Sequence, residues 1–523
     1  MESMDAHWNR GRAFEAAHDL KSAQTEYEAL LAIDGRHIPA RLRMSRFAQF
    51  RGDYTAAHHH ALQAADAARL GGSSRHLAFV TLRLLDFSED AEVASVILSA
   101  DPADPEVLRQ APMLAQHLWL VERYDDALRF LDAVSPRLPP NPLLWFTRGQ
   151  ILRFLGRLDE AAEAYERSLH LRPDFSDAHW AIATNRSARP ALARVDRLHA
   201  ALRNAAPDSL EMAQLQYALF HELDGADETD AAWASLMEGA RIMRGLVRYD
   251  AARFAARLDA LMAADWTPPA LDADERRQPL PVFVVGLPRT GTTLLDRILG
   301  NHGWVRSVGE RNDFAASVSR AGGRFFGSMA DASDLDWLED LSCPRVGHGY
   351  IASMQRLAPG VAMSLDKNPQ NLFNIPLIVR ALPHAKILCV RRDPMDAGFS
   401  NLKALFQGGA YAYSYDLGDI AAHLTATGRW SRHWADRLAE SVKLVDYEAL
   451  ATEPDTTVAG ITDFLGLPRR DGLSDITGNA SPVATASSAQ VREAIHTRAL
   501  GAWTRYAAQL APLREALAQA GHP

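Results

Sequence analysis

A strand, a glycine-bracketed loop and a helix follow one another in the segment PVFVVGLPRTGTTLLDRILGNH. The spacing from Gly286 to Gly291 is that of a phosphate-binding loop, because glycines permit tight turns and the following helix offers unpaired N–H groups with partial positive charge. A nucleoside triphosphatase would place a lysine and a hydroxyl residue after the second glycine, but this chain has Thr292 and Thr293 there. The loop is therefore suited to a 5′-phosphate, with Arg289 as its cation, and ATP hydrolysis is disfavoured. The alternative is that the glycine pair only makes a tight strand-to-helix turn.

A second strand, turn and helix are expected in PHAKILCVRRDPMDAGFSNLKALF. The strand is expected from Ala385 to Val390, and Pro394 suits the first position of the helix. Ser400 follows Arg392 by eight residues, so that a guanidinium and a hydroxyl group could share one phosphate. The alternative is an ion-paired arginine at the end of a strand.

The two segments together resemble a known family. The string PRTGTTL resembles the 5′-phosphosulfate-binding loop of sulfotransferases that depend on 3′-phosphoadenosine 5′-phosphosulfate (PAPS), including tyrosylprotein sulfotransferases and bacterial relatives linked to tetratricopeptide repeats. Arg392 and Ser400 match the family's 3′-phosphate-binding element in spacing. The resemblance implies an α/β domain with a P-loop-like parallel sheet, PAPS as the donor, 3′,5′-adenosine bisphosphate as the product, and no metal. The loop residues that it implies for the nucleotide are Arg289, Thr290, Gly291, Thr292 and Thr293.

Two further residues are candidates for the transfer step, which needs in-line positioning, a base for the acceptor proton and a cation for the leaving oxygen. Glu310, in VGERNDF, lies 21 residues after Arg289, in the region of the family's catalytic glutamate, which implies a general base. Lys367, in SLDKNPQNLF, has a setting similar to that of a lysine in the tyrosylprotein enzymes, which implies that its ammonium balances charge on the bridging oxygen. The alternatives are a solvated loop carboxylate and a plain surface lysine.

The resemblance continues to about residue 506, over roughly half of the chain. In VDYEALATEP, Tyr447 matches a tyrosine that lies near the 3′-phosphate, although it could equally be a core residue at the start of a helix. In ATASSAQVREAIHTRALGAW, Ser487 matches a phosphate-binding serine and Trp503 matches the family's tryptophan. The tyrosylprotein enzymes have a lysine before that tryptophan, where this chain has Ala502. The residues that could supply the missing cation are Arg492, His496 and Arg498.

The elements that must position these residues fall into two halves of different composition. Residues 1 to about 265 are rich in Ala, Leu, Arg and Glu and predict helices throughout. From residue 279 onward, short β-branched strands alternate with helical patterns, which predicts a parallel sheet. We expect the domains to be 1–185 as repeats, 186–278 as a helical connector or degenerate repeats plus a linker, and 279–523 as the sulfotransferase domain.

The first half contains an internal repeat. Aligning Ala23, Ala57, Ala127 and Ala161 gives spacings of 34, 70 and 34 residues, and the middle gap fits two repeats with a short insertion. This period resembles the helix–turn–helix tetratricopeptide repeat (TPR), and an array of such repeats is an all-α superhelix. The pattern is clear at residues 142–175 and 4–71 and weak at 72–107. In the clearest copy the expected positions are occupied by Trp145, Gly149, Gly156, Ala161, Tyr165 and Pro173.

Bulk properties limit the partners. The formal net charge of −9 argues against nucleic acid, because no global positive field would attract it. Cys343 and Cys389 give no disulfide framework or zinc ligand set. The first twenty residues lack the apolar core of a signal peptide, and no run of about 18 apolar residues occurs. We therefore expect a cytoplasmic protein without a transmembrane segment.

The acceptor stays open, because acceptor pockets come from variable loops. A tyrosyl protein, a glycan, a lipid and a small-molecule hydroxyl are all compatible with the sequence, and the repeats could bind a protein or polymeric acceptor or a second subunit in a homo-oligomer. Tyr411, Tyr413 and Tyr415 could line the acceptor cleft or pack a loop. The rival functions are a nucleotide kinase or NTPase and a catalytically silent TPR scaffold.

Overall fold

The computed structural model describes residues 3–71, 74–185, 192–267, 278–406, 408–479, 481–482 and 493–521. The chain divides into two compact units. The repeat unit comprises Met1–Ile151 and Ala315–Gly327, and the sheet unit comprises Leu152–Phe314 and Ser328–Pro523.

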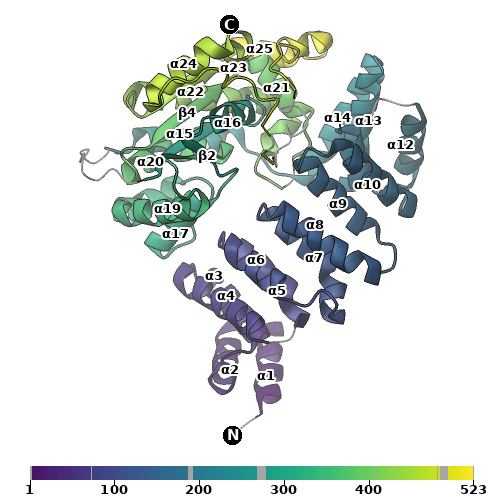
Figure 1. Cartoon of the computed structure of the whole chain (residues 1–523), viewed down its shortest axis with the longest axis vertical. Helices are drawn as coiled ribbons and strands as arrows, with labels where there is room; N and C mark the ends of the chain where they lie inside the picture. Colours follow the sequence, from purple (N-terminus) through teal and green to yellow (C-terminus); the bar gives the residue numbers. More distant parts are fainter. Residues whose placement is uncertain are drawn as a thin grey trace. The chain divides into compact units, whose positions relative to one another are not determined.

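The repeat unit is built from helices that pack in successive pairs, α1 with α2, α3 with α4, α5 with α6 and α7 with α8 (Figure 1). The helices are α1 (Met4–Ala16), α2 (Leu20–Ile33), α3 (Ile38–Phe50), α4 (Tyr54–Arg69), α5 (Leu77–Leu85), α6 (Asp90–Leu98), α7 (Pro105–Leu120), α8 (Tyr124–Val134) and most of α9 (Pro142–Phe154). The short helix η1 (Ser74–His76) precedes α5.

Each helix pair repeats the same turn. A residue with positive φ stands two positions before the second helix of every pair, and these residues are His18, Gly52, Ser88 and Glu122. The fourth residue of the second helix is fully buried in every pair, and these residues are Ala23, Ala57, Val93 and Ala127. The small side chain of alanine lets the two helices of a pair approach closely. The pattern is weak between residues 72 and 107 because Val93 replaces the alanine and its spacing from Ala57 is 36 residues. The expected pair of repeats with a short insertion is therefore present.

Among the residues that the structure describes, six α-helices that lie wholly in the sheet unit precede its strands. They are α10 (Leu158–Leu171), α11 (Ser176–Ala183), α12 (Leu192–Asn204), α13 (Leu210–Gly225), α14 (Thr229–Leu246) and α15 (Ala251–Ala263). Helix α13 packs directly on the part that contains the strands: the Tyr217 hydroxyl donates to the carbonyl of Leu402 at 3.1 Å, and the Tyr506 hydroxyl donates to Asp224 at 2.7 Å. The expected boundaries at residues 185 and 278 stay predictions.

Five parallel strands form one sheet in the order β2-β3-β1-β4-β5. The strands are β1 (Leu280–Gly286), β2 (Val305–Ser307), β3 (Met363–Lys367), β4 (Lys386–Arg391) and β5 (Val442–Asp446). The chain goes from β3 on one side of β1 to β4 on the other, so that the central strand marks the switch point of the sheet, where ligands bind outside the carboxyl ends of the strands. The fold class expected from the sequence, helical repeats followed by an α/β domain with a parallel sheet, is confirmed.

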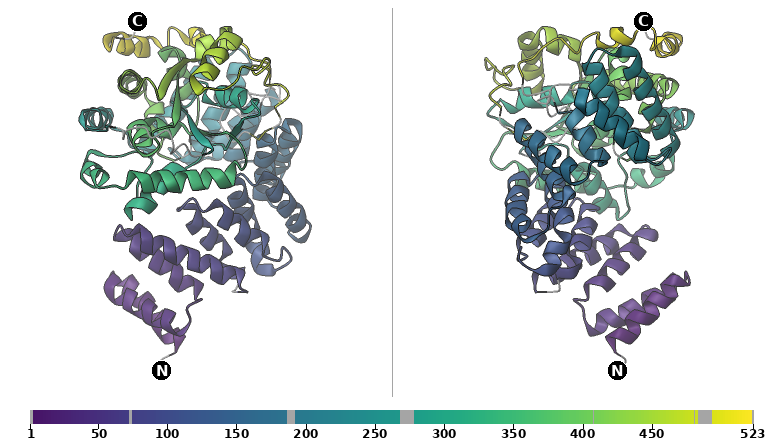
Figure 2. Two further views of the ribbon diagram at one scale, coloured as in Figure 1. Left: turned by 60° about the vertical axis from the view of Figure 1, so that its left-hand side comes forward. Right: turned by 90° about the vertical axis from the view of Figure 1, so that its right-hand side faces the viewer.

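Helices cover both faces of the sheet (Figure 2). Val282 and Val284 pack with Leu295 on one face, whereas Phe283 stacks on Tyr350 on the other, with ring centroids 5.2 Å apart. Burial on both faces explains the uninterrupted apolar run of β1. The α-helices that the structure describes in this part are α16 (Thr292–Gly300), α18 (Leu335–Glu339), α19 (Cys343–Leu357), α20 (Ile375–Ala381), α21 (Pro394–Leu402), α22 (Leu417–Arg437), α23 (Tyr447–Thr452), α24 (Pro454–Leu465) and α25 (Ala511–Gln519). Helix α17 (Asp313–Gly322) begins here, and all but its first two residues belong to the repeat unit.

Residues 315–327, which lie between strands β2 and β3 in the sequence, belong to the repeat unit. There the Arg320 guanidinium forms an ion pair with Glu89 at 2.9 Å, and the backbone N–H of Tyr54 donates to the carbonyl of Gly323 at 3.1 Å. The chain therefore enters the repeat unit five residues after Glu310. None of the helices that the structure describes has the length and apolar composition needed to cross a membrane.

Candidate active site

The predicted functional residues follow the carboxyl ends of all five strands. Arg289 follows β1, Glu310 follows β2, Lys367 ends β3, Arg392 follows β4 and Tyr447 follows β5. Because the strands are parallel, their carboxyl ends lie along one edge of the sheet. Residues from distant parts of the sequence are thereby brought to the same edge of the sheet.

The loop between β1 and α16 depends on its two glycines. Gly286 and Gly291 have φ values of 151° and 103°, which side chains rarely adopt. A Cβ on Gly286 would meet the carbonyl of Val390 at 2.5 Å, and a Cβ on Gly291 would collide with the ring of Tyr447. Gly291 is the N-cap of α16, so that the N-terminal end of this helix, with its partial positive charge, lies next to the loop.

Neighbouring side chains hold this loop in place. The Asn401 amide donates to the carbonyl of Pro288 at 3.0 Å, and Arg392 Nη1 donates to the carbonyl of Arg289 at 3.1 Å. The Thr290 hydroxyl donates to the carbonyl of Leu287 at 2.7 Å. The hydroxyl of Thr290 is thus used inside the loop, and Thr290 does not line the adjacent cavity.

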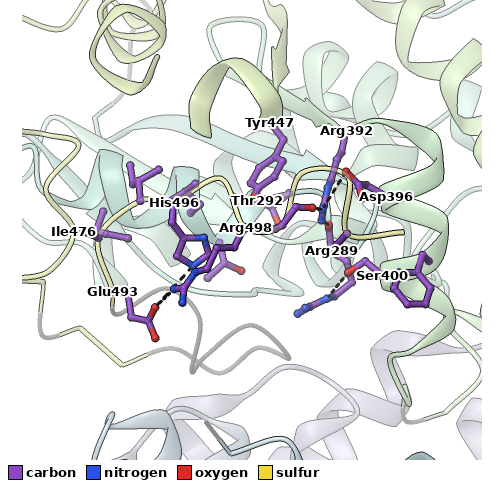
Figure 3. A pocket seen from close by; sticks show the side chains of 18 of the residues that line it. Arg289, Thr292, Arg392, Asp396, Ser400, Tyr447, Ile476, Glu493, His496 and Arg498 are labelled. Carbon is purple, nitrogen blue, oxygen red and sulfur yellow. Dashed lines mark hydrogen bonds and ion pairs between the residues drawn. The ribbon is translucent and has the colours of Figure 1, made fainter. Parts of the chain in front are cut away.

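A cavity of about 520 Å³ opens beside the loop (Figure 3). The predicted nucleotide-binding residues that line it are Arg289, Gly291, Thr292, Thr293, Arg392, Ser400, Tyr447, His496 and Arg498. Glu310 and Lys367 are not among the residues that line it, and Ser487 and Arg492 lie outside the described residues. Figure 3 shows Arg289, Arg392 and Ser400 on one side of the cavity and Glu493 with Arg498 on another.

The Arg392 side chain is 7% exposed and lines the cavity. Its Nη2 donates to the carbonyl of Ala499, its guanidinium lies 4.7 Å from the ring centroid of Tyr447, and Asp396 lies 3.7 Å away. No hydrogen-bond partner of its buried Nε is found among the described residues. A buried guanidinium with an unused donor fits an anionic ligand, because an unpaired buried N–H is unfavourable.

The Arg289 and Ser400 side chains meet in the same cavity, where Arg289 Nε donates to the Ser400 hydroxyl at 3.3 Å. Ser400 lies on α21, which follows β4, and Arg289 lies in the loop after β1. The two phosphate-binding elements inferred from the sequence therefore share one cavity. Their cations, hydroxyls and helix N–H groups fit a nucleotide that carries two phosphate-type groups.

Lys403 also lines the cavity and was not identified from the sequence. It is the C-cap of α21, three residues after Ser400, and its ammonium lies 4.7 Å from the ring centroid of Phe399. It forms no ion pair with any residue that the structure describes. Burial, together with the nearby charge of Arg289, lowers the pKa of Lys403 to about 8. The sequence could have pointed to Lys403, because it follows Ser400 by three residues on a predicted helix. Residues three apart share a helix face.

The segment after residue 493 is tied to α21 through Asp396. The Asp396 carboxylate accepts hydrogen bonds from the backbone N–H groups of Gly501 at 2.7 Å and Trp503 at 3.4 Å. Arg498 forms an ion pair with Glu493, whereas His496 Nε2 lies 3.9 Å from the same carboxylate. Two of the three basic residues that could replace the missing lysine, His496 and Arg498, therefore share one acidic neighbour.

Glu310 and Lys367 form a pair. Lys367 Nζ lies 2.5 Å from Glu310 Oε1, and the side chains are 3% and 39% exposed, respectively. The end of β3 holds the glutamate loop by two further bonds: Lys367 N–H donates to the carbonyl of Gly309 at 3.0 Å, and the Asn368 amide donates to that of Arg311 at 2.8 Å. Asn368 is thus a positioning residue for the pair.

The three tyrosines of the GGAYAYSYD segment have different surroundings. The Tyr413 ring stacks on His423 with centroids 3.6 Å apart, and the Tyr415 hydroxyl donates to the carbonyl of Phe406 at 3.1 Å, so that both pack the protein interior. Burial raises the pKa of Tyr411 to about 12, and the negative charge of Glu310 contributes to the increase. Of the three tyrosines, Tyr411 is therefore the one whose pKa the negative charge of Glu310 helps to raise.

Two parts of the chain match known protein families: residues 281–472 match the sulfotransferase family, and residues 142–175 match the tetratricopeptide repeat. An uncharacterized protein of Aquifex aeolicus is 23% identical over 403 residues, which cover 75% of this chain and 52% of that protein. A putative protein-tyrosine sulfotransferase of Caenorhabditis briggsae is 24% identical over 237 residues, which cover 42% of this chain and 80% of that protein. The chain therefore spans about half the length of the Aquifex protein.

Among solved structures, the sulfotransferase domain of a Synechococcus olefin synthase is 19% identical and covers 48% of this chain and 98% of that chain, with a TM-score of 0.29. The family matches confirm the resemblance to sulfotransferases and to TPR proteins that the motifs indicated.

Proposed function

From the sulfotransferase match over residues 281–472, we propose that this protein transfers a sulfuryl group from PAPS to an acceptor hydroxyl. One observation supports the proposal beyond the family match: residues of the two segments that we predict to bind phosphate, at the ends of β1 and β4, line one cavity. A bisphosphorylated adenosine needs two such places, whereas an ordinary nucleoside triphosphate has no 3′-phosphate to occupy the second.

The first place would hold the 5′-side of the nucleotide. Arg289, Thr292 and Thr293 line the cavity next to the N-terminus of α16, where the helix dipole favours an anion. The position of the P-loop lysine is taken by Thr292, which is consistent with a ligand that has no γ-phosphate. When bound, PAPS would supply an activated sulfuryl group at this end.

The second place would hold the 3′-phosphate. Arg392, whose side chain is 7% exposed, and Ser400 supply a guanidinium and a hydroxyl, and Lys403 adds an ammonium that also lines the cavity. Charge-assisted hydrogen bonds from buried donors are about twice as strong as neutral ones. We propose that Lys403, together with His496 and Arg498, provides the positive charge that the tyrosylprotein enzymes obtain from the lysine before the tryptophan.

Glu310 and Lys367 would carry the chemistry. In the proposed step the acceptor oxygen forms a bond to sulfur, the bond between sulfur and the bridging oxygen breaks with its electron pair on that oxygen, and Glu310 takes the hydroxyl proton. Lys367 would stabilise the negative charge that develops on the bridging oxygen. Asn368 would hold Glu310 next to Lys367, because its amide donates to the carbonyl of Arg311 in the loop that carries Glu310.

The experiment that tests this function uses the full chain and PAPS labelled in its sulfur. A panel of acceptors, consisting of a tyrosine peptide, a polysaccharide, a hydroxylated lipid and a phenol, is incubated with the protein, and label in each acceptor is measured together with 3′,5′-adenosine bisphosphate. The proposal expects equal amounts of labelled acceptor and bisphosphate with at least one acceptor, and neither with the Glu310→Gln variant. Nucleotide binding without transfer to any acceptor would favour the scaffold instead.

A further inference from the structure

A hydrogen bond links helix α16 to the strand that precedes Glu310. The Ser307 hydroxyl, at the end of β2, donates to Asp296 Oδ1 at 2.6 Å. Asp296 lies on α16, four residues after Thr292 and three after Thr293, and both threonines line the nucleotide cavity. Residues at these spacings share a helix face, so that one face of α16 extends from the cavity to the strand that leads to Glu310.

The loop that carries Glu310 follows a short strand at the edge of the sheet. In the sheet that the structure describes, β2 pairs with β3 over three residues and has no strand on its other side. The backbone N–H of Val308 still donates to the carbonyl of Leu365 at 2.9 Å. The next N–H group, that of Gly309, donates to the Ser307 hydroxyl oxygen at 3.4 Å. The Ser307 hydroxyl therefore contacts both α16 and the loop that carries Glu310.

Apolar packing already attaches α16 to the sheet. Leu295, Ile298 and Leu299 on the helix lie in one buried cluster with Val305 on β2 and Leu365 on β3. The bond between Asp296 and Ser307 is therefore not required to attach the helix. Because a hydrogen bond is directional whereas apolar packing is not, this bond instead determines where the end of β2 lies relative to α16.

The charges near Asp296 are those of the proposed catalytic pair. Burial raises the pKa of Asp296, the positive charge of Lys367 and the hydrogen bond from Ser307 lower it, and the negative charge of Glu310 raises it further. The Asp296 carboxylate is therefore close enough to both members of the pair to interact with their charges. Its hydrogen bond goes to Ser307, so that it acts on Glu310 through the backbone between them.

We propose that Asp296 and Ser307 are positioning residues, which fix the loop that carries Glu310 relative to the donor-binding end of α16. This inference rests on the proposed sulfuryl transfer, because in-line attack requires the base and the donor to be held in a set geometry. The first turn of α16 lies at the cavity, and Asp296, one turn later, holds the end of β2. One helix would thereby position both the donor and the base, while Asn368 secures the same loop from the end of β3.

Hydrogen exchange measured by mass spectrometry tests the positioning without an acceptor. The full chain and its variants are compared in peptides that cover residues 305–312. Exchange there should become about two- to tenfold faster in Asp296→Ala and in Ser307→Ala, as expected for the loss of one hydrogen bond. It should stay at the wild-type rate in Asp296→Asn, because the amide oxygen still accepts from the Ser307 hydroxyl.

The matched control is Ser474→Ala. The Ser474 hydroxyl donates to Asp455 Oδ1 at 2.5 Å, so that this variant also removes a bond between a serine and an aspartate, and neither residue lines the nucleotide cavity. The control should leave exchange in residues 305–312 unchanged. Urea denaturation of each variant checks that the chain is folded before exchange is compared.

Transfer of labelled sulfuryl groups measures the catalytic consequence, with the acceptor of the panel that takes up the most label. The kcat should fall roughly ten- to a hundredfold in Asp296→Ala and in Ser307→Ala, whereas the affinity for 3′,5′-adenosine bisphosphate should stay at the wild-type value. The double variant should be no slower than the slower single variant, because both side chains act through one bond. Asp296→Asn should retain the wild-type kcat.

Unchanged exchange in Asp296→Ala would overturn the proposal. So would a loss of bisphosphate affinity as large as the loss of kcat, since Asp296 would then act on donor binding, or an equal loss of kcat in Asp296→Asn, since its charge would then matter instead of its bond. If the wild type labels no acceptor, the proposed function fails, and exchange together with bisphosphate affinity still decides whether Asp296 and Ser307 hold the loop.

Discussion

The pH dependence of nucleotide binding should be controlled by Lys403. Burial lowers the pKa of this lysine to about 8, from an ordinary value of 10.5, and the positive charges of Arg289 and Arg392 act in the same direction. Asp224 and Asp396 act in the opposite direction. His221, whose pKa burial lowers to about 4, stays neutral in the alkaline range. A bound 3′-phosphate would favour the charged ammonium, so that binding takes up a proton when the pH lies near or above 8.

The size of the effect follows from the fraction of Lys403 that is protonated before the ligand binds. With a pKa of about 8, that fraction falls from about 0.9 at about pH 7 to about 0.1 at about pH 9. If only the protonated form binds well, the affinity for 3′,5′-adenosine bisphosphate falls about tenfold over this interval, or about 1.4 kcal/mol. The phosphates of the ligand are already ionised above about pH 7 and do not produce a decrease.

Isothermal titration calorimetry measures both the affinity for 3′,5′-adenosine bisphosphate and the number of protons taken up on binding. The affinity is recorded between about pH 7 and about pH 9, and titrations in buffers of different ionisation enthalpy give the number of protons taken up. The Lys403→Arg variant keeps its charge throughout this range and should show a nearly flat profile, whereas Lys403→Met should be flat and weaker. The same tenfold decrease in Lys403→Arg would refute the assignment, because another group would then be titrating.

Three further predictions concern binding, catalysis and the loop. Arg392→Ala should weaken 3′,5′-adenosine bisphosphate by about 2–5 kcal/mol and adenosine 5′-monophosphate much less, because the buried guanidinium would pair with the 3′-phosphate; equal losses for the two ligands in calorimetry would contradict this role. Glu310→Gln should slow sulfuryl transfer by about 100- to 10,000-fold and leave bisphosphate affinity unchanged; wild-type turnover in the labelled-PAPS assay would exclude it as the base. Gly291→Ala should lower the free energy of unfolding by roughly 1–3 kcal/mol, because φ is positive there and the new methyl group would collide with Tyr447. Urea denaturation measures that change, with Gly360→Ala as the control, since its φ is also positive but a Cβ there has no neighbour within 4 Å.

The sequence predicted the features that depend on local geometry. A run of apolar residues, two glycines and a helix start are consecutive in the chain, so the phosphate loop could be identified before the sheet was known. The repeats were found where Ala23 and Ala57, and again Ala127 and Ala161, lie 34 residues apart. The third pair was obscured because Val93 replaces the alanine and two extra residues precede it. A single substitution with a short insertion is enough to weaken a periodic signal.

Contacts between distant segments could not be predicted in the same way. Lys403 acquires its place in the cavity from the packing of α21 beside the first loop, and Asn401 reaches the carbonyl of Pro288 across more than a hundred residues. Similarly, nothing in the local sequence of residues 315–327 indicates that they pack on the repeats. These features depend on tertiary packing, which local propensity does not encode.

The central claim, that the cavity at the carboxyl edge of the sheet binds a bisphosphorylated adenosine, is tested most directly by calorimetric titration of the full chain. The titrants are 3′,5′-adenosine bisphosphate and, in a separate experiment, ATP with Mg²⁺. Our account predicts tight binding of the bisphosphate, and no binding of Mg-ATP, because the loop lacks the lysine that a triphosphate requires. Preference for Mg-ATP would contradict the account and favour a kinase, and binding of neither nucleotide would favour a scaffold without donor-site chemistry.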